Sequence, residues 1–332
     1  QLNMKAEALA AWELLYAYDP MESAHVEALE RLFRQLGRHE DLVRILVAKA
    51  DLLEEPNARA MALGEAARIS DEVLADSTLT IDILQKLLLA DAESREAVTS
   101  LRRLLASEGR YVELGELLSS QGEMCADPEL RKSLNLELAR TRFSHLDDVS
   151  GAIETLQLVL SENPHDSEVL GLIDSFDESL AERDDAINER LELLAIAEPV
   201  ARAQQNDARL TEILRVKFSA EESDFEKVVL QDEISDLLVN QQRYSEAFDA
   251  TAAAVALTPD DEERRKRLED LGNLCDRERD VVSVLRQSAA NADSVSAADI
   301  FVRVAGILER LGDDSEAMVA FEEALSSNES DE

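Results

Sequence analysis

The residue types that carry most protein chemistry are few in this sequence, or lack the spacing that such chemistry requires. No histidine lies three or four residues from another histidine or from a cysteine, the spacing that brings two metal ligands onto one helix face. The four histidines are His25, His39, His145 and His165. Two cysteines, Cys125 and Cys275, are too few for a thiolate metal site or a disulfide scaffold. Two interpretations stay open: a disulfide bond between the two cysteines, or two separate thiols that act as small hydrophobic side chains.

Carboxylates are so abundant that their proximity carries little information about acid–base catalysis. The chain has 72 Asp and Glu residues, and the pairs Asp147-Asp148, Asp184-Asp185 and Asp313-Asp314 stand where helix-capping turns are expected. No glycine-rich phosphate loop, calcium loop or nucleophile elbow occurs in the sequence. We therefore expect no catalytic, cofactor-binding or metal-binding residues, and no cofactor.

The net charge of the chain limits the classes of molecule that it can bind. The 332 residues carry a formal charge of −38 at pH 7, which repels nucleic acid and anionic lipid headgroups. Basic partners are favoured, although high charge also serves solubility alone. The longest uncharged stretch, 250–259, is about half of the ~20 residues that a bilayer requires, so no membrane insertion is expected.

The prolines mark a regular spacing of the elements that would position any site. Steps of 36 from Pro20 reach Pro56, Ala92, Pro128 and Pro164, and the next step falls one residue past Pro199. Proline is disfavoured inside a helix, so regular prolines predict regular turns between helices. A period in the mid-thirties is typical of stacked helical hairpins.

Between these turns the apolar residues recur at helical spacing. Stripes such as Leu29, Leu32, Phe33 and Leu36 alternate with turns at glycine, as at Gly37. Only 4% of residues are aromatic and 10 are glycine, which argues against a turn-rich β fold. The pattern predicts an all-α protein of about eighteen helices without strands.

The sequence resembles the tetratricopeptide repeat family over nearly its whole length. Three segments carry the resemblance: Phe301, Val304, Ala305, Leu308, Gly312, Ala317, Phe321 and Ala324; Ile234, Ser235, Leu238, Tyr244, Ala247, Ala254 and Pro259; Leu136, Ala139, Phe143, Ala152, Leu156, Val159 and Pro164. The sequence departs from the family at Glu30, Arg102 and Arg140, where a small residue is usual. The resemblance implies an α-α superhelix of stacked antiparallel helix pairs.

The repeat register fails once, which divides the chain into three predicted parts. Pro199 and Pro259 are separated by more than one repeat and less than two. We expect repeats over 1–198 with an incomplete first hairpin, an irregular helix or joint over 199–222, and repeats over 223–332 with a short acidic tail.

The two ends suggest a piece of a longer array. Residues 5–17 read as the second helix of a hairpin whose first helix is missing, and Trp12 gives this end an apolar surface. A solenoid normally ends in a polar cap. We expect possible end-to-end self-association through the Trp12 end.

One run of four basic residues stands out in this acidic chain, Arg264 to Arg267. It follows four acidic residues, so helical i,i+4 pairs such as Asp261–Arg265 and Glu263–Arg267 are expected to neutralise it. A docking patch for an acidic partner is the alternative.

The leading interpretation is a non-enzymatic scaffold that binds a peptide or partner protein of basic or mixed charge on the concave face of the solenoid. The family resemblance places these residues on that face: Glu27, Arg31, Glu96, Arg103, Glu137, Asp232, Glu233, Asp236, Asp299 and Arg303. The alternatives are a self-assembling structural segment, or an accessory repeat domain of a larger protein whose activity lies elsewhere. The sequence names no compartment; a soluble, cytoplasmic protein is slightly favoured.

Overall fold

The computed structural model describes residues 2–328, which form eighteen α-helices, one π-helical turn and no strand. The expected all-α fold is confirmed. Residues 329–332, most of the expected acidic tail, lie outside the described part. None of the helices in 2–328 is long and apolar enough to cross a bilayer. The chain divides into two compact units, 1–159 and 160–332.

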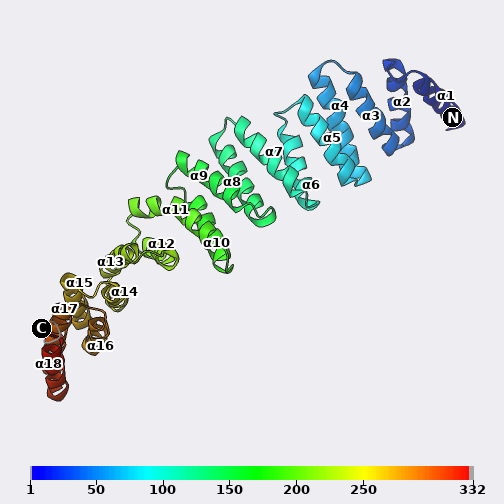
Figure 1. The fold of residues 1–332 in the computed structure, drawn as a ribbon. Coiled ribbons are helices and arrows are strands. Elements are labelled where there is room, and N and C mark those ends of the chain that lie inside the picture. The colour runs from blue at the N-terminus through cyan, green and yellow to red at the C-terminus, as the bar shows by residue number, and fades with distance from the viewer. Residues whose placement is uncertain (1, 329–332) are drawn as a thin grey trace. The chain divides into compact units, whose positions relative to one another are not determined.

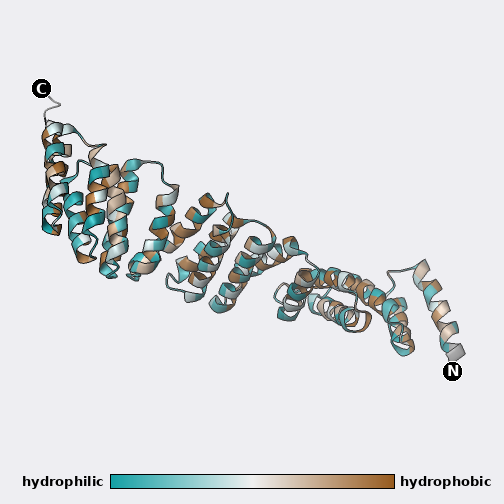
Figure 2. Ribbon diagram, turned by 90° about the horizontal axis from the view of Figure 1, so that it is seen from below, coloured by the Kyte–Doolittle hydropathy of each residue, from teal (hydrophilic) through white to brown (hydrophobic). Residues whose placement is uncertain are grey.

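In the first unit each helix from α1 to α7 packs against the next one along the chain, up to α8. Figure 1 shows them side by side, with hydrophobic and hydrophilic residues mixed along each helix in Figure 2. The helices are α1 Leu2–Tyr18, α2 Ser23–Leu36, α3 His39–Leu52, α4 Pro56–Ile69 with the π turn η1 Ser70–Leu74, α5 Ser77–Ala90, α6 Arg95–Ser107, α7 Tyr111–Met124, α8 Pro128–His145 and α9 Val149–Glu162. Their apolar faces form a core that runs from Leu9 to Leu138.

The second unit is built in the same way, each helix packing against its successor. Its helices are α10 Ser167–Ala181, α11 Ile187–Ala203, α12 Asp207–Ala220, α13 Asp224–Asn240, α14 Tyr244–Leu257, α15 Glu262–Leu274, α16 Glu278–Ala289, α17 Ser294–Leu311 and α18 Asp314–Asn328. Antiparallel helix pairs stacked through nearest neighbours are the α-solenoid arrangement.

Proline marks a turn or a helix start at five of its six positions. Pro56 and Pro128 are the first residues of α4 and α8, where the missing N–H has no intrahelical partner to lose. The expectation is wrong at Pro199, which lies inside α11. Helix α11 therefore continues to Ala203, and its last turn buries Val200 and Ala201.

An ion-pair network appears twice, once in each unit. Glu30 of α2 accepts hydrogen bonds from Arg34 at 2.9 Å and from Lys49 of α3 at 2.8 Å, and Arg34 also pairs with Glu65 of α4. The second network lies 168 positions further along, with Glu198, Arg202, Lys217 and Glu233 in the same roles. These four residues belong to α11, α12 and α13. The helices α11 to α13 thus correspond to α2 to α4.

The same physical balance holds in both networks. Burial opposes ionisation of Glu30, but hydrogen bonds from Lys49 and Arg34 outweigh it and hold the pKa of Glu30 below its ordinary value. Burial likewise opposes ionisation of Glu198, and the hydrogen bonds from Lys217 and Arg202 outweigh it and lower the pKa of Glu198. Each carboxylate is therefore charged at neutral pH, and each network ties three consecutive helices together.

The correspondence continues through the turns. Gly37, with φ 66°, ends α2, and Gln205, with φ 53°, stands 168 positions later after α11. Gly109 and Asp276 match likewise, with φ of 68° and 56°. In order, α11–α18 repeat α2–α9, and one further helix, α1 or α10, precedes each set. The helix expected over 200–222 exists as α12 and pairs with α11 as α3 pairs with α2; a mechanical joint there stays a prediction.

Replacing Gln205 by Gly should stabilise the protein by about 0.5–1 kcal/mol, because a left-handed backbone costs Gln more than Gly. The matched change, Gly37→Gln, should lower stability by a similar amount. Urea unfolding followed by circular dichroism measures both. Equal effects of the same sign at the two turns would contradict the equivalence.

Candidate functional site: a groove between the first helices of two hairpins

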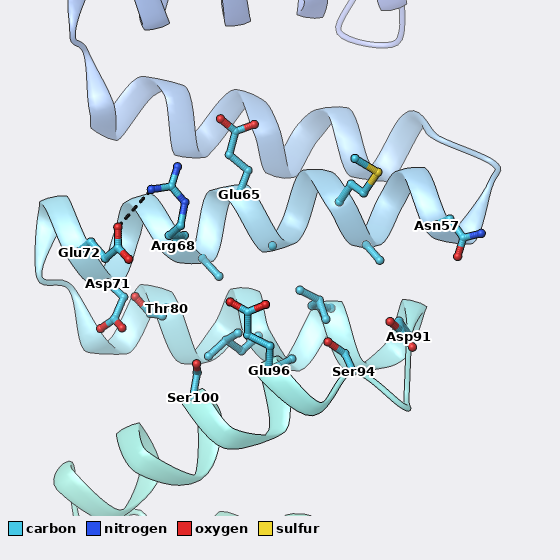
Figure 3. A pocket seen from close by; sticks show the side chains of 17 residues that line it. Asn57, Glu65, Arg68, Asp71, Glu72, Thr80, Asp91, Ser94, Glu96 and Ser100 are labelled. Atoms are coloured by element: carbon cyan, nitrogen blue, oxygen red, sulfur yellow. Dashed lines mark hydrogen bonds and ion pairs between the residues drawn. The ribbon is translucent and has the colours of Figure 1, made fainter.

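A groove of about 560 Å³ opens in the first unit between α4 and α6. Helix α5 forms its floor through Thr80, Leu84 and Leu87, and η1 closes one end. Figure 3 shows Asp71 and Glu72 at that end, Asp91 and Ser94 at the other, and Glu96 between them. The groove therefore lies on the face formed by the first helices of the hairpins.

Small side chains keep this groove open. Gly64 of α4 faces it, together with Ala97 and Ser100 of α6. A Cβ atom on Gly64 would meet only Leu87 Cδ1, at 3.6 Å. Because close-packed interiors tolerate few voids, a gap of this size at a helix interface depends on missing side chains.

The lining is strongly acidic, with five carboxylates and one arginine, Arg68. Three carboxylates have cationic partners: Glu65 with Arg34, Glu72 with Arg68 at 3.1 Å, and Asp71 with Arg103 at 2.6 Å. The other two, Asp91 and Glu96, form no ion pair within residues 2–328. The groove thus keeps uncompensated negative charge close to its open centre.

The π-helical turn positions the acidic end of the groove. Residues 70–74 widen the helix after α4, and Ala75 then adopts a left-handed conformation with φ 52°. Thr80 Oγ1 donates hydrogen bonds to Ser70 Oγ at 2.9 Å and to the Asp76 carbonyl at 2.7 Å. Such π turns are frequent at functional sites. Here the turn is locked by buried hydroxyl groups, which holds Asp71 and Glu72 at the groove.

The corresponding place in the second unit is closed. The positions of Gly64, Arg68, Ala97 and Ser100 correspond to Asp232, Asp236, Arg264 and Arg267, by offsets of 168 on α13 and 167 on α15. Arg264 Nη2 lies 2.7 Å from Asp232 Oδ2, and Arg267 Nη2 lies 2.5 Å from Asp236 Oδ1. Two ion pairs therefore bridge α13 and α15 where the first unit has small residues.

The structure distributes the predicted site residues of the first unit over three helices. Glu96 lines the groove, and Arg103 contacts its edge through Asp71. Glu137 of α8 pairs with Arg102 of α6. Glu27 and Arg31 are exposed on α2 and form no ion pair with any described residue. Only Glu96 and Arg103 are thus brought to one site.

In the second unit the predicted residues connect neighbouring first helices. Asp232 and Asp236 bind the arginines of α15, and Glu233 binds Arg202 of α11. Arg303 of α17 binds Asp299, Glu262 and Glu269. Each predicted residue is in an ion pair between or along these helices, and a role in partner binding stays a prediction.

Sequence reasoning missed the residues that open the groove, Gly64, Ala97 and Ser100. Ala97 is buried and Gly64 and Ser100 are half-buried, and small residues at such positions give no signal by composition. A comparison of positions 167 and 168 residues apart would have shown the change from small to charged residues.

The basic run pairs differently from the expectation. Arg265 binds Asp299 of α17 at 3.1 Å and the Pro259 carbonyl at 2.5 Å, and Arg267 binds Asp236. The expected pairs of these arginines with Asp261 and Glu263 are wrong, because both side chains point to neighbouring helices. Arg265 is 3% exposed, so the run holds α13, α15 and α17 together.

Three further features of the sequence concern metal ligands, the two cysteines and Trp12. Among residues 2–328 no three His, Cys, Asp or Glu residues form a metal-binding group. Cys125 and Cys275 are both free thiols, and burial raises the pKa of the Cys275 thiol. Trp12 is half-buried against α2, with its ring 5.9 Å from that of His25.

Comparisons with known proteins find structural similarity only. No family model and no curated protein matches the chain. The chain is similar to the C-terminal part of a TPR repeat-containing protein from Cytophaga hutchinsonii, with 13% identity, 79% of this chain and 93% of that chain covered, and a TM-score of 0.31. It is also similar to the TPR2AB domain of yeast Sti1 in complex with pHSP90, with 12% identity, coverages of 81% and 99%, and a TM-score of 0.33.

A third similar structure is a tetratricopeptide repeat protein from Parabacteroides merdae, with 14% identity, coverages of 81% and 93%, and a TM-score of 0.26. All three are structures of tetratricopeptide-repeat proteins or domains. At these identities the likeness concerns the fold alone.

Replacing Arg265 by Met should lower the free energy of unfolding by about 2 kcal/mol, because it leaves the buried Pro259 carbonyl without its donor and removes one of the two arginines that bind Asp299. The matched control is Lys266→Met on the same helix turn, where the side chain is exposed and the change should stay within about 0.5 kcal/mol. Urea unfolding of both variants provides the comparison. Equal losses would show that Arg265 does not hold the helices together.

Proposed function

We propose that this chain is a non-enzymatic protein-interaction scaffold that binds a basic segment of a partner protein in the groove between α4 and α6. The observation that carries the proposal is an open groove with an apolar floor and an excess of carboxylates. Such a site attracts a cationic segment and gives its aliphatic stems a surface to cover.

The chemistry of the lining supports binding over catalysis. No histidine, cysteine or lysine is among the groove residues, so no nucleophile with an adjacent base is present there. Glu96 and Asp91 remain available to a ligand cation, while the other carboxylates hold the helices in place. The overall charge of −38 would speed the approach of a basic partner.

The proposal predicts that Glu96→Gln weakens binding of a labelled, alanine-rich helical peptide carrying several lysines and arginines by about threefold or more. The matched control is Glu263→Gln, at the corresponding position of the closed second copy, which should leave binding unchanged. Fluorescence anisotropy at about 0.05 and about 0.3 M salt measures both, and binding should fall with salt. No binding of the peptide, or equal loss in both variants, would refute the proposal.

Self-association is a second candidate, supported by exposed apolar side chains on both terminal helices. Leu14 and Tyr18 of α1 are 74% and 92% exposed, and Met318 and Leu325 of α18 are 66% and 67% exposed. The residues that offer this surface on α1 are Leu14 and Tyr18, since Trp12 packs on α2. If the ends associate, light scattering should show a mass that rises with concentration, and Leu14→Glu/Tyr18→Glu should abolish the rise. A monomer at high concentration would contradict this candidate.

A further inference from the structure

The second copy shows what fits the space between two first helices. Arg264 donates from Nε and Nη2 to Asp232 Oδ2 at 3.0 and 2.7 Å, and Arg267 donates from Nη2 to Ser235 Oγ at 2.9 Å. Their side chains are 25% and 31% exposed. Two guanidinium groups, one helical turn apart, therefore lie in the interface between α13 and α15.

The first copy keeps the frame and lacks these side chains. The ion-pair network at Glu30 and Glu65 matches that at Glu198 and Glu233, so the paths of the helices correspond. Ala97 and Ser100 replace the two arginines, and Gly64 replaces the aspartate that binds one of them. The groove is the space that two arginine side chains take up in the other copy.

Carboxylates remain around this space. Glu65 corresponds to Glu233, and Glu96 corresponds to Glu263. Figure 3 shows the Glu96 side chain extending from α6 toward α4, into the region between the two helices. The first copy thus lacks the two arginines of the second copy and keeps Glu65 and Glu96 beside the space, while Gly64 and Arg68 stand in place of the two aspartates that bind those arginines.

We infer that the groove selects a helical segment presenting two arginines three residues apart, Arg-x-x-Arg, whose side chains enter where Arg264 and Arg267 lie in the second copy. The inference rests on the proposed function and names its ligand. Residues three apart on a helix differ in height by ~4.5 Å and share one face, as the two arginines of α15 do. An extended strand places alternate residues farther apart, at ~6.6 Å.

Arginine should bind better than lysine at such a site. A guanidinium group offers five donors in a planar fork and can pair with a carboxylate through two parallel bonds, whereas an ammonium group acts as a point charge. In the second copy Arg264 uses this fork on Asp232, donating from Nε to Oδ1 at 3.3 Å and from Nη2 to Oδ2 at 2.7 Å. The groove should therefore distinguish two peptides of equal charge.

Three alanine-rich helical peptides of equal length and charge test this inference. One carries Arg-x-x-Arg, one Lys-x-x-Lys, and one the same two arginines five residues apart, on different helix faces. Anisotropy titrations with the full chain should show the first peptide binding about tenfold more tightly than either of the others. Equal affinity for all three would overturn the inference and leave the proposed function standing, whereas binding of none would overturn both.

A double variant that introduces the ion pair of the second copy into the groove gives a second test. The double variant Gly64→Asp/Ala97→Arg installs the pair found at Asp232 and Arg264, so it should fold with an unchanged circular dichroism spectrum. Binding of the Arg-x-x-Arg peptide should fall at least tenfold, because the peptide's place is occupied. Unchanged binding by this folded variant would overturn the inference.

Discussion

From α1 to α8 and from α10 to α18, each helix covers its apolar face against its neighbours along the chain, and the other features of the structure depend on this constraint. A core built from nearest neighbours extends with the chain, from Leu9 to Leu138 in the first unit. It leaves the outward face of each first helix free of packing demands. That face can carry charge, small residues or ion pairs without cost to the core, and α4 and α6 differ there from α13 and α15.

Arginine–carboxylate pairs on this face decide whether neighbouring first helices are joined or separated by a groove. Most such pairs are at least partly exposed, and pairs of that kind contribute about 0–1 kcal/mol each. Their effect is mainly geometric: Arg264 and Arg267 take up the space between α13 and α15, while Ala97 and Ser100 leave it open between α4 and α6. One backbone arrangement thus provides a reinforced surface in one copy and an accessible acidic groove in the other.

The tandem correspondence also explains the single failure of the repeat register. If consecutive helices are paired from α2 onward, one helix near residues 200–222 has no partner. If they are paired from α11 onward, every helix up to α18 has one. The additional helix is the one that precedes each set, α1 or α10. The turn at Gln205 has the left-handed backbone of the turn at Gly37, although its residue type gives no sign of it.

The sequence by itself determined the helices, their number and their stacking order, because these depend on local periodicity, on turn residues and on where proline is tolerated. Among the residues that the family resemblance places on the first-helix face, Glu96 lines the groove and Arg103 contacts its edge through Asp71. Tertiary structure alone decided which charges meet: Arg265 joins Asp299, 34 positions away, and not Asp261 on its own helix. It also decided where a groove remains, since this depends on pairs of side chains across an interface. Gly64 and Ala97 indicate a groove only when α4 and α6 are known to lie side by side.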